Sequence, residues 1–132
     1  MVKVLFDHNM SPLIARALHI IVESEGHLAI PLRDKFSVQI DDASFFTALG
    51  KDGDWIVISK DVKNAKRPPE REAILRSGVL AFYLEPSVQR LKISEQTATI
   101  LWQWEKLVSH RKTTRNGLFL IPVNKGSKFR SL

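Results

Sequence analysis

The sequence contains no cysteine, which excludes disulfide bonds and thiolate metal sites. Cysteine-free chains suit a reducing compartment, so we expect a cytoplasmic protein. No apolar run approaches the roughly twenty residues of a membrane span, and the start lacks the features of a signal peptide. We therefore expect a soluble protein with no membrane partner. The length of 132 residues is enough for one domain with its own core, and we expect a single domain over residues 1–132.

Acidic residues are absent after Glu105, although cations continue to the end of the chain. These cations are Lys106, Arg111, Lys112, Arg115, Lys125, Lys128 and Arg130. They account for the net charge of +6, since 20 Lys and Arg minus these seven leaves 13, against 14 acids. A basic C-terminal segment, about 106–132, suits a polyanion, and nucleic acid is the commonest one. The alternative is a solvated tail.

Short apolar runs alternate with helical patterns along the chain. Strands are predicted at 2–6, 27–33, 55–59, 79–84 and 117–123. Helices are predicted over 11–24, from Asp41 or Asp42 to Gly50, over 70–77 and over 93–110, with a polar basic loop at 60–69. This alternation, with strands apolar at nearly every position, favours an α/β fold whose mainly parallel sheet is covered on both faces.

Two helices show an apolar stripe that predicts a buried face. The first stripe is Ile14, Ala17, Leu18, Ile21 and Val22, and the second is Ile93, Thr97, Ile100, Leu101, Trp104, Leu107 and Val108. For Trp102 and Trp104, packing is favoured over a base-stacking role.

Acids follow two of the strands and open one helix. Asp7 comes directly after the first strand, Asp61 follows the apolar run 55–59, and Asp41 and Asp42 stand at a helix start. In a right-handed βαβ arrangement the carboxyl ends of strands and the N-termini of the helices meet at one sheet edge. We therefore expect acids from three parts of the chain to lie near one another.

Grouped carboxylates need a cation, because two of them about 4 Å apart repel by roughly 4 kcal/mol at an effective dielectric constant near 20. Oxygen ligands favour Mg²⁺ or Mn²⁺, and such a site suits hydrolysis of phosphodiesters by a metal-activated water. Each acid also has a simpler interpretation: Asp41 or Asp42 as a helix N-cap, Asp61 as a turn residue, and Asp7 as a cap for the helix that follows it. No histidine has the spacing of a zinc site.

The stretches VLFDHNMSPLIARAL, DDASFFTAL and WIVISKD together resemble the compact PIN-like nucleases, whose short members include VapC-like toxins of toxin–antitoxin pairs. The match covers roughly the first two thirds of the chain, and the stretch KNAKRPPEREAILRSGVLAFYL resembles a longer-tailed subgroup. The resemblance implies a three-layer α/β/α sandwich. It also implies a Mg²⁺- or Mn²⁺-dependent ribonuclease that is controlled by a cognate antitoxin and can form a homodimer.

Position by position, the resemblance makes Asp7, Asp42 and Asp61 catalytic metal ligands. Asn9 would hold a metal-bound water or phosphate, and Ser59 would hydrogen-bond to a carboxylate, with Asp41 as a further supporting acid. PIN domains commonly carry one more acid on an early helix, for which this chain offers only Glu23, Glu25 or Asp34.

The cations that follow the third acid are the candidate RNA contacts. Lys60, Lys63, Lys66 and Arg67 would line the rim of the cleft and bind phosphates, and a solvated loop is the alternative.

Two other functions remain open from the sequence. One is a catalytically inactive PIN-like module that binds RNA or protein. The other is a phosphoaspartate receiver or phosphatase, which also starts with a strand ending in Asp. It is disfavoured because the chain lacks the second aspartate and the small residues that follow it in such phosphatases.

Overall fold

A computed structural model describes the backbone of residues 1–132 and every side chain in that range except that of Asn64. Within the described residues, five strands form one sheet in the order β2-β1-β3-β4-β5, and each neighbouring pair is parallel. The strands are β1 (Lys3–Phe6), β2 (Leu28–Pro31), β3 (Trp55–Ser59), β4 (Leu80–Leu84) and β5 (Gly117–Ile121). All five predicted strands are confirmed.

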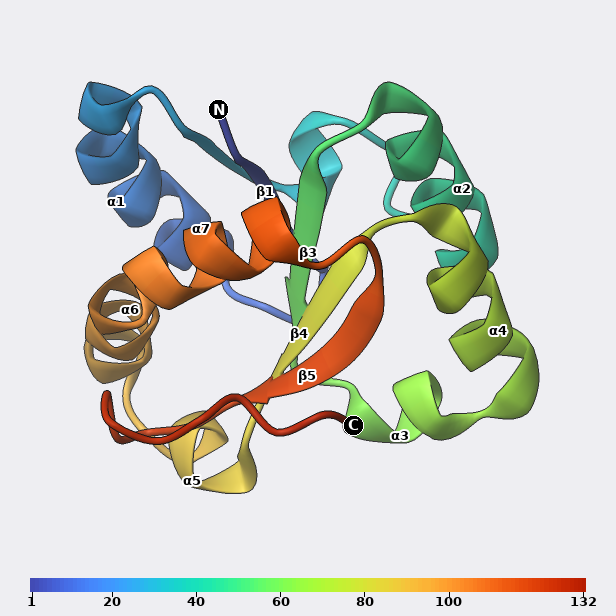
Figure 1. The fold of residues 1–132 in the computed structure, drawn as a ribbon. Helices are drawn as coiled ribbons and strands as arrows, with labels where there is room; N and C mark the ends of the chain where they lie inside the picture. Colours follow the sequence, from blue (N-terminus) through green and yellow to red (C-terminus); the bar gives the residue numbers. More distant parts are fainter.

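The helices are α1 (Pro12–Val22), α2 (Asp42–Asp52), α3 (Val62–Lys66), α4 (Pro68–Ser77), α5 (Pro86–Gln89), α6 (Ile93–Trp102) and α7 (Trp104–Thr113), with short 3₁₀ turns at Glu23–Glu25 and Leu32–Asp34. Helices α1, α6 and α7 lie on one face of the sheet, and α2 and α4 lie on the other (Figure 1). The predicted three-layer α/β/α sandwich is confirmed. Among the described residues no helix could cross a lipid bilayer.

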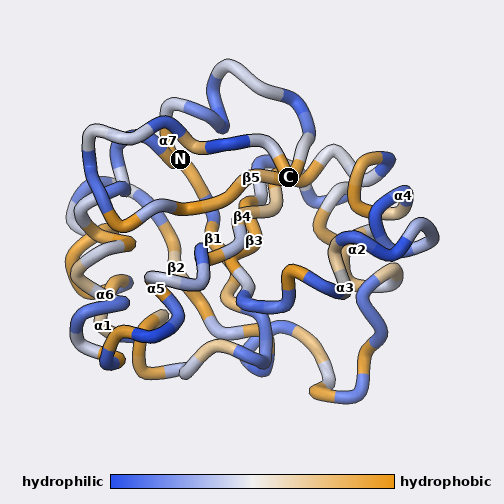
Figure 2. The backbone as a smooth tube through the Cα atoms, turned by 90° about the horizontal axis from the view of Figure 1, so that it is seen from below, coloured by the Kyte–Doolittle hydropathy of each residue, from blue (hydrophilic) through white to orange (hydrophobic). Residues whose placement is uncertain are grey.

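Alternating strand residues point into two cores, one on each face of the sheet. Phe6, Ile58 and Phe82 join the core beneath α1, α6 and α7, whereas Leu5 and Val57 join the core beneath α2 and α4. Hydrophobic segments follow the central strands in Figure 2. Burial on both faces explains why these strands are apolar at nearly every position.

Local sequence signals set most helix ends. The Ser11 side chain caps α1 by accepting a hydrogen bond from the Leu13 amide, and Pro12 takes the first helical position. Gly78 ends α4 with a φ of 78°, a left-handed conformation that favours glycine. Gly50 allows α2 to approach α4 closely, since a Cβ there would lie 2.0 Å from the Ser77 carbonyl oxygen.

The single helix predicted over 93–110 is wrong, because it breaks at Gln103. The Gln103 side chain is fully buried, and its Nε2 donates to the carbonyl oxygens of Pro122 and Asn124. Satisfying these carbonyls inside the protein fixes Gln103 at φ −94° and ψ 1°, outside helical values. The two apolar stripes are also partly wrong: Ile93, Ala17 and Ile21 are exposed, and Ala15 is buried instead.

Two basic segments are more ordered than one interpretation of the sequence allowed. Residues 62–66 of the expected polar loop form α3. The C-terminal segment is not a solvated tail: it contributes α7 and β5 to the fold and then turns back along β5. There Leu120 N donates to Arg130 O at 2.8 Å, and Phe119 and Ser131 form an antiparallel bridge.

Candidate functional site

The carboxyl edge of the sheet gathers the residues predicted at the site. Asp7 follows β1, Ser59 ends β3 and Asp61 comes two residues later. Because α2 runs back across the sheet, its first residue, Asp42, is near the same edge. The parallel register thus explains how residues from distant parts of the sequence meet.

Asp7 is a buried carboxylate, with only 7 % of its surface exposed. Its Oδ1 accepts a hydrogen bond from the His8 amide at 2.7 Å and lies 2.9 Å from His8 Nδ1. Its Oδ2 accepts from Ser59 Oγ at 3.2 Å. Burying a charge is costly unless it is hydrogen-bonded, so these donors allow a charged group to end a core strand.

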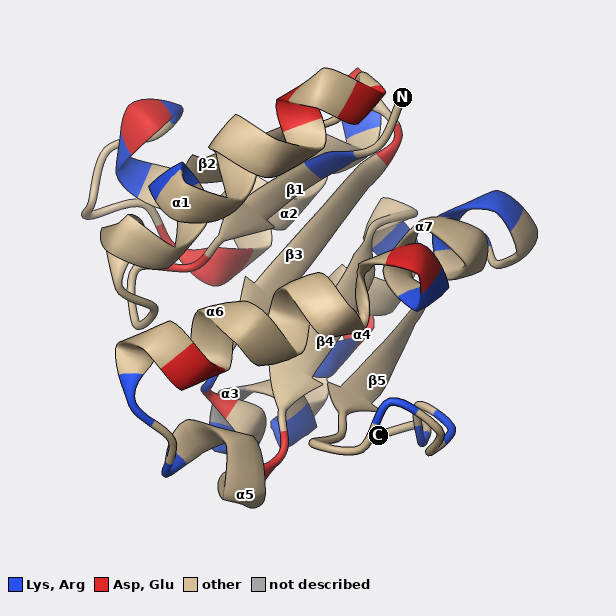
Figure 3. Cartoon of the chain, turned by 90° about the vertical axis from the view of Figure 1, so that its left-hand side faces the viewer, with Lys and Arg blue, Asp and Glu red and all other residues tan. Residues whose placement is uncertain are grey.

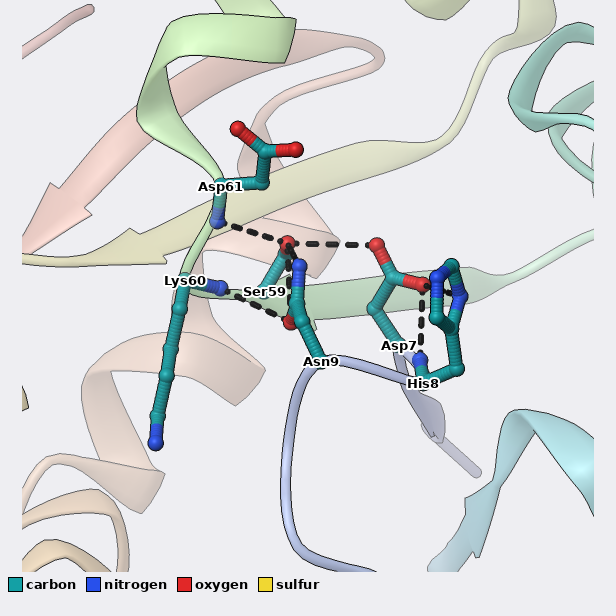
Figure 4. A network of polar contacts seen from close by, with 6 residues as sticks. All are labelled: Asp7, His8, Asn9, Ser59, Lys60 and Asp61. Atoms are coloured by element: carbon teal, nitrogen blue, oxygen red, sulfur yellow. Dashed lines mark hydrogen bonds and ion pairs between the residues drawn. The ribbon is translucent and has the colours of Figure 1, made fainter.

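Ser59 connects the two central loops through one hydroxyl (Figure 4). Its Oγ accepts from Asn9 Nδ2 at 3.0 Å and from the Asp61 amide at 3.1 Å. A hydroxyl carries a single proton, and with both of these donors in place the proton is free for Asp7 Oδ2. The hydrogen bond expected from Ser59 to a carboxylate is therefore present.

Asn9 completes this network from the other side. Its Oδ1 accepts from the Lys60 amide at 3.2 Å, so the loop after β1 and the loop after β3 are joined at two points. The side chains of Asp61, Lys63 and Arg67 are exposed. Because the network uses the Asp61 and Lys60 amides, it fixes the backbone of this loop while leaving its charged side chains at the surface.

Tyr83, which sequence reasoning missed, lies next to Ser59 in the β3–β4 register and is 3 % exposed. Burial raises the pKa of the Tyr83 hydroxyl above its ordinary value, and three carboxylates raise it further. These are Asp7, Asp42 and Asp61, whereas Arg71 on α4 lowers the same pKa. The charges of all three predicted acids therefore act on one buried hydroxyl near the carboxyl edge of the sheet.

The two adjacent acids at the start of α2 differ in their surroundings and contacts. Asp41 is the N-cap: its carboxylate accepts from the Ser44 amide at 2.8 Å, and this hydrogen bond lowers the pKa of Asp41. Asp42 is half-buried in the first turn and lines a pocket of about 230 Å³ with Asp41 and Glu70. Glu70 stands in the first turn of α4, and its Oε2 is buried with no hydrogen-bond partner among the described residues. Glu70 was not predictable from the sequence, because only the packing of α2 on α4 brings it beside Asp42.

The acids considered for a further position lie elsewhere. Glu23 and Glu25 follow α1 at the opposite edge of the sheet, and Glu23 pairs with His19. Asp34 forms an ion pair with Arg16 on α1. Across the part of the chain that the structure describes, no three His, Asp or Glu side chains form a group that could hold one metal ion.

The model of the family described as "PIN like domain" matches residues 2–86, more than half of the chain. This range runs from β1 to the start of α5 and includes Asp7, Asp42 and Asp61. Neither the curated proteins nor the solved structures gave a significant match. The chain therefore belongs to the PIN-like domain family, which is a family of nuclease type.

Proposed function

We propose that this protein is a metal-dependent endoribonuclease that hydrolyses RNA phosphodiesters at the carboxyl edge of its sheet. The observation that carries the proposal is that three acids from separate parts of the chain lie at one edge of the sheet, with Asp7 held there by Ser59. A common ligand would explain why acids from three separate parts of the chain lie at this one edge of the sheet.

The donor set fits a hard divalent cation. Asp7, Asp42 and Asp61 offer only carboxylate oxygens, which suit Mg²⁺ or Mn²⁺. When bound, such an ion lowers the pKa of a water that attacks phosphorus and offsets charge on the leaving oxygen. Ser59 and Asn9 keep Asp7 and the Asp61 backbone in place, while Asp41 caps α2 and so fixes where Asp42 begins the helix.

Exposed cations beside the site supply phosphate contacts in this proposal. Lys63 and Lys66 lie on α3 and Arg67 precedes α4, while the Lys60 backbone is held by Asn9. Such contacts position RNA without reading its sequence.

We further propose that the protein is the toxin of a type II toxin–antitoxin pair and acts in the cytoplasm, with a cognate antitoxin as its partner. For a homodimer, the candidate surface is the outer side of α1 and α6, two helices that pack on each other. Leu13 and Ile20 are 64 % and 77 % exposed on α1, and Trp102 is 59 % exposed on α6. Apolar patches of this kind suit a partner protein.

One observation favours a second candidate, a catalytically inactive module that binds RNA or protein. The described acids do not form a ready three-ligand group. Titration with Mn²⁺ separates the two functions, since the enzyme should bind Mn²⁺ and lose it on Asp7→Asn, whereas the module should bind none. The direct test of the enzyme is RNA cleavage that requires both the metal and Asp61.

A further inference from the structure

A groove of about 640 Å³ lies beside the candidate site and is built mainly by chain outside the family match. Its polar lining is Glu85, Ser87, Asn124, Ser127, Lys128 and Arg130, and of these only Glu85 falls within residues 2–86. The groove is therefore a feature that the C-terminal segment adds to this chain. No residue proposed for catalysis lines it.

Side-chain hydrogen bonds hold the loop that forms one wall of the groove. Gln103 Nε2 donates to Pro122 O at 3.1 Å and to Asn124 O at 3.0 Å. Lys106 Nζ donates to Ser127 O at 2.9 Å and also to Lys125 O. Because side chains of α7 and the α6–α7 junction satisfy these carbonyls, the loop has its shape before any ligand arrives.

Lys128 and Arg130, the two cations of the groove, lie on either side of the buried Phe129 in the sequence. Phe129 is 8 % exposed and stacks on His110 with ring centroids 5.3 Å apart. Neighbouring residues of an extended segment point to opposite sides, so an inward Phe129 turns Lys128 and Arg130 outward. Both cations are exposed. Figure 3 shows these basic segments along the C-terminal tail and others around α3.

The groove continues the edge that carries the acids. Glu85 follows β4 and Pro122 follows β5, and these strands come after β3 in the sheet order. Adjacent strands lie about 4.8 Å apart, so the end of β5 is about 10 Å from the end of β3. Gln89 links the loop after β3 to the end of β4, beside the groove. Its Nε2 donates to Lys60 O at 3.1 Å and to Leu84 O at 2.8 Å.

We propose that this groove binds a single-stranded segment of the RNA substrate, with phosphates on Lys128 and Arg130. The inference rests on the proposed function for its choice of RNA. Of the eight lining residues only Pro122 and Val123 are apolar, and protein partners usually need a buried aromatic or aliphatic anchor that this lining lacks. Hydroxyl and amide side chains beside two cations instead match phosphate and sugar oxygens.

Glu85 restrains anion binding in the groove. Its Oε1 lies 3.1 Å from Arg130 Nη2, and its side chain is 18 % exposed against 72 % for Arg130. An arriving phosphate must share Arg130 with this carboxylate and is repelled by its charge. Removing the charge should therefore tighten RNA binding.

The test is the affinity of a fluorescently labelled ten-nucleotide oligouridylate, measured by anisotropy in EDTA over a range of KCl concentrations. We expect Lys128→Ala/Arg130→Ala to weaken binding about tenfold and to reduce the slope of log K against log salt by about 1.4, the value for two phosphate contacts on a single strand. Glu85→Gln should bind more tightly than the wild type.

The matched control is Lys51→Ala/Lys112→Ala. It removes the same charge from exposed lysines in the last turns of α2 and α7, which end at the opposite sheet edge. The groove variant should keep its fold, since the backbone carbonyl of Arg130 makes the contact to β5. Equal losses in both double variants, or none in the groove variant, would overturn the proposal. An oligoglutamate peptide whose binding needs Lys128 and Arg130 while RNA binding does not would also overturn it, in favour of an acidic protein segment.

The same variants separate the groove from the proposed activity. If the wild type cleaves RNA in Mn²⁺ but the groove variant binds RNA normally, the groove assignment fails and the nuclease stands. If nothing is cleaved but RNA binding depends on Lys128 and Arg130, the nuclease fails and the groove stands.

Discussion

Ser59 Oγ donates to Asp7 Oδ2 at 3.2 Å, a hydrogen bond between the ends of two neighbouring strands whose residues lie 52 positions apart in the sequence. The same oxygen accepts from Asn9 and from the Asp61 amide. One hydroxyl therefore fixes the position of the first acid and the backbone of the third.

Ser59→Ala should destabilise the protein and impair the site. The change leaves the Asp61 amide and the Asn9 amide group without an acceptor and removes a donor from the buried Asp7, so we expect a loss of about 1–3 kcal/mol in the free energy of unfolding. Urea unfolding measures it as a lower midpoint with an unchanged m value. Ser109→Ala is the control, because it removes a hydroxyl from an exposed position on α7, away from this network. A midpoint like that of the wild type would contradict the linking role of Ser59.

Mn²⁺ should stabilise the wild type and not Asp7→Asn. A ligand that binds only the folded state stabilises it by about 2.7 kcal/mol at a hundredfold excess over its dissociation constant. The melting temperature with and without Mn²⁺ is the readout, and it needs no activity. Asp54→Asn makes the same chemical change at the amino edge of β3 and should keep the response. A Mn²⁺ shift that survives in Asp7→Asn would remove Asp7 from the proposed metal site.

Tyr83 is the chain's only tyrosine, so phenolate absorbance reports it alone. Burial and then the charges of Asp7, Asp42 and Asp61 raise its pKa, so it should ionise at higher pH than a free tyrosine. The variant Asp42→Asn/Asp61→Asn should begin to ionise at lower pH, provided circular dichroism shows the fold intact. If the two titrations coincide, the carboxylates do not surround this hydroxyl.

His110 should make the protein less stable in mild acid. Burial first, and then the charge of Lys106, lower the pKa of His110 below its ordinary value. The unfolded chain then binds more protons than the folded one, so stability falls as pH drops through the ordinary histidine pKa. His110→Phe should flatten this dependence, since the ring stacks on Phe129 and its buried Nδ1 has no hydrogen-bond partner in the part of the chain that the structure describes. Urea midpoints at about pH 7.5 and pH 5.5 test it, and parallel curves for the two proteins would contradict it.

Structural features that depend on residues close together in the sequence were predictable. Ser11 and Pro12 start α1, Asp41 caps α2 and Gly78 ends α4, each through a backbone preference or a short-range hydrogen bond. The placement of Asp7 at a strand end followed from the apolar run before it. The alternation of strands and helices predicted a parallel sheet, and in such a sheet Asp7 and Asp61 lie at the same carboxyl edge.

Features that depend on distant partners were not predictable. The break at Gln103 exists because its amide reaches carbonyls that follow β5, and nothing near Gln103 in the sequence indicates them. The sequence around Tyr83 indicates only a core residue, and the β3–β4 register is what places it beside Ser59. Likewise, Glu70 meets Asp42 only because α2 and α4 pack together.

Cleavage of a mixed pool of transfer and ribosomal RNA tests the central claim most directly. Purified wild type, Asp61→Asn and the control Asp54→Asn are each incubated with Mn²⁺ or EDTA, after circular dichroism has shown that all three are folded. The account predicts cleavage by the wild type and Asp54→Asn in Mn²⁺, and none in EDTA or by Asp61→Asn. Identical background from the wild type and Asp61→Asn in Mn²⁺ would contradict it.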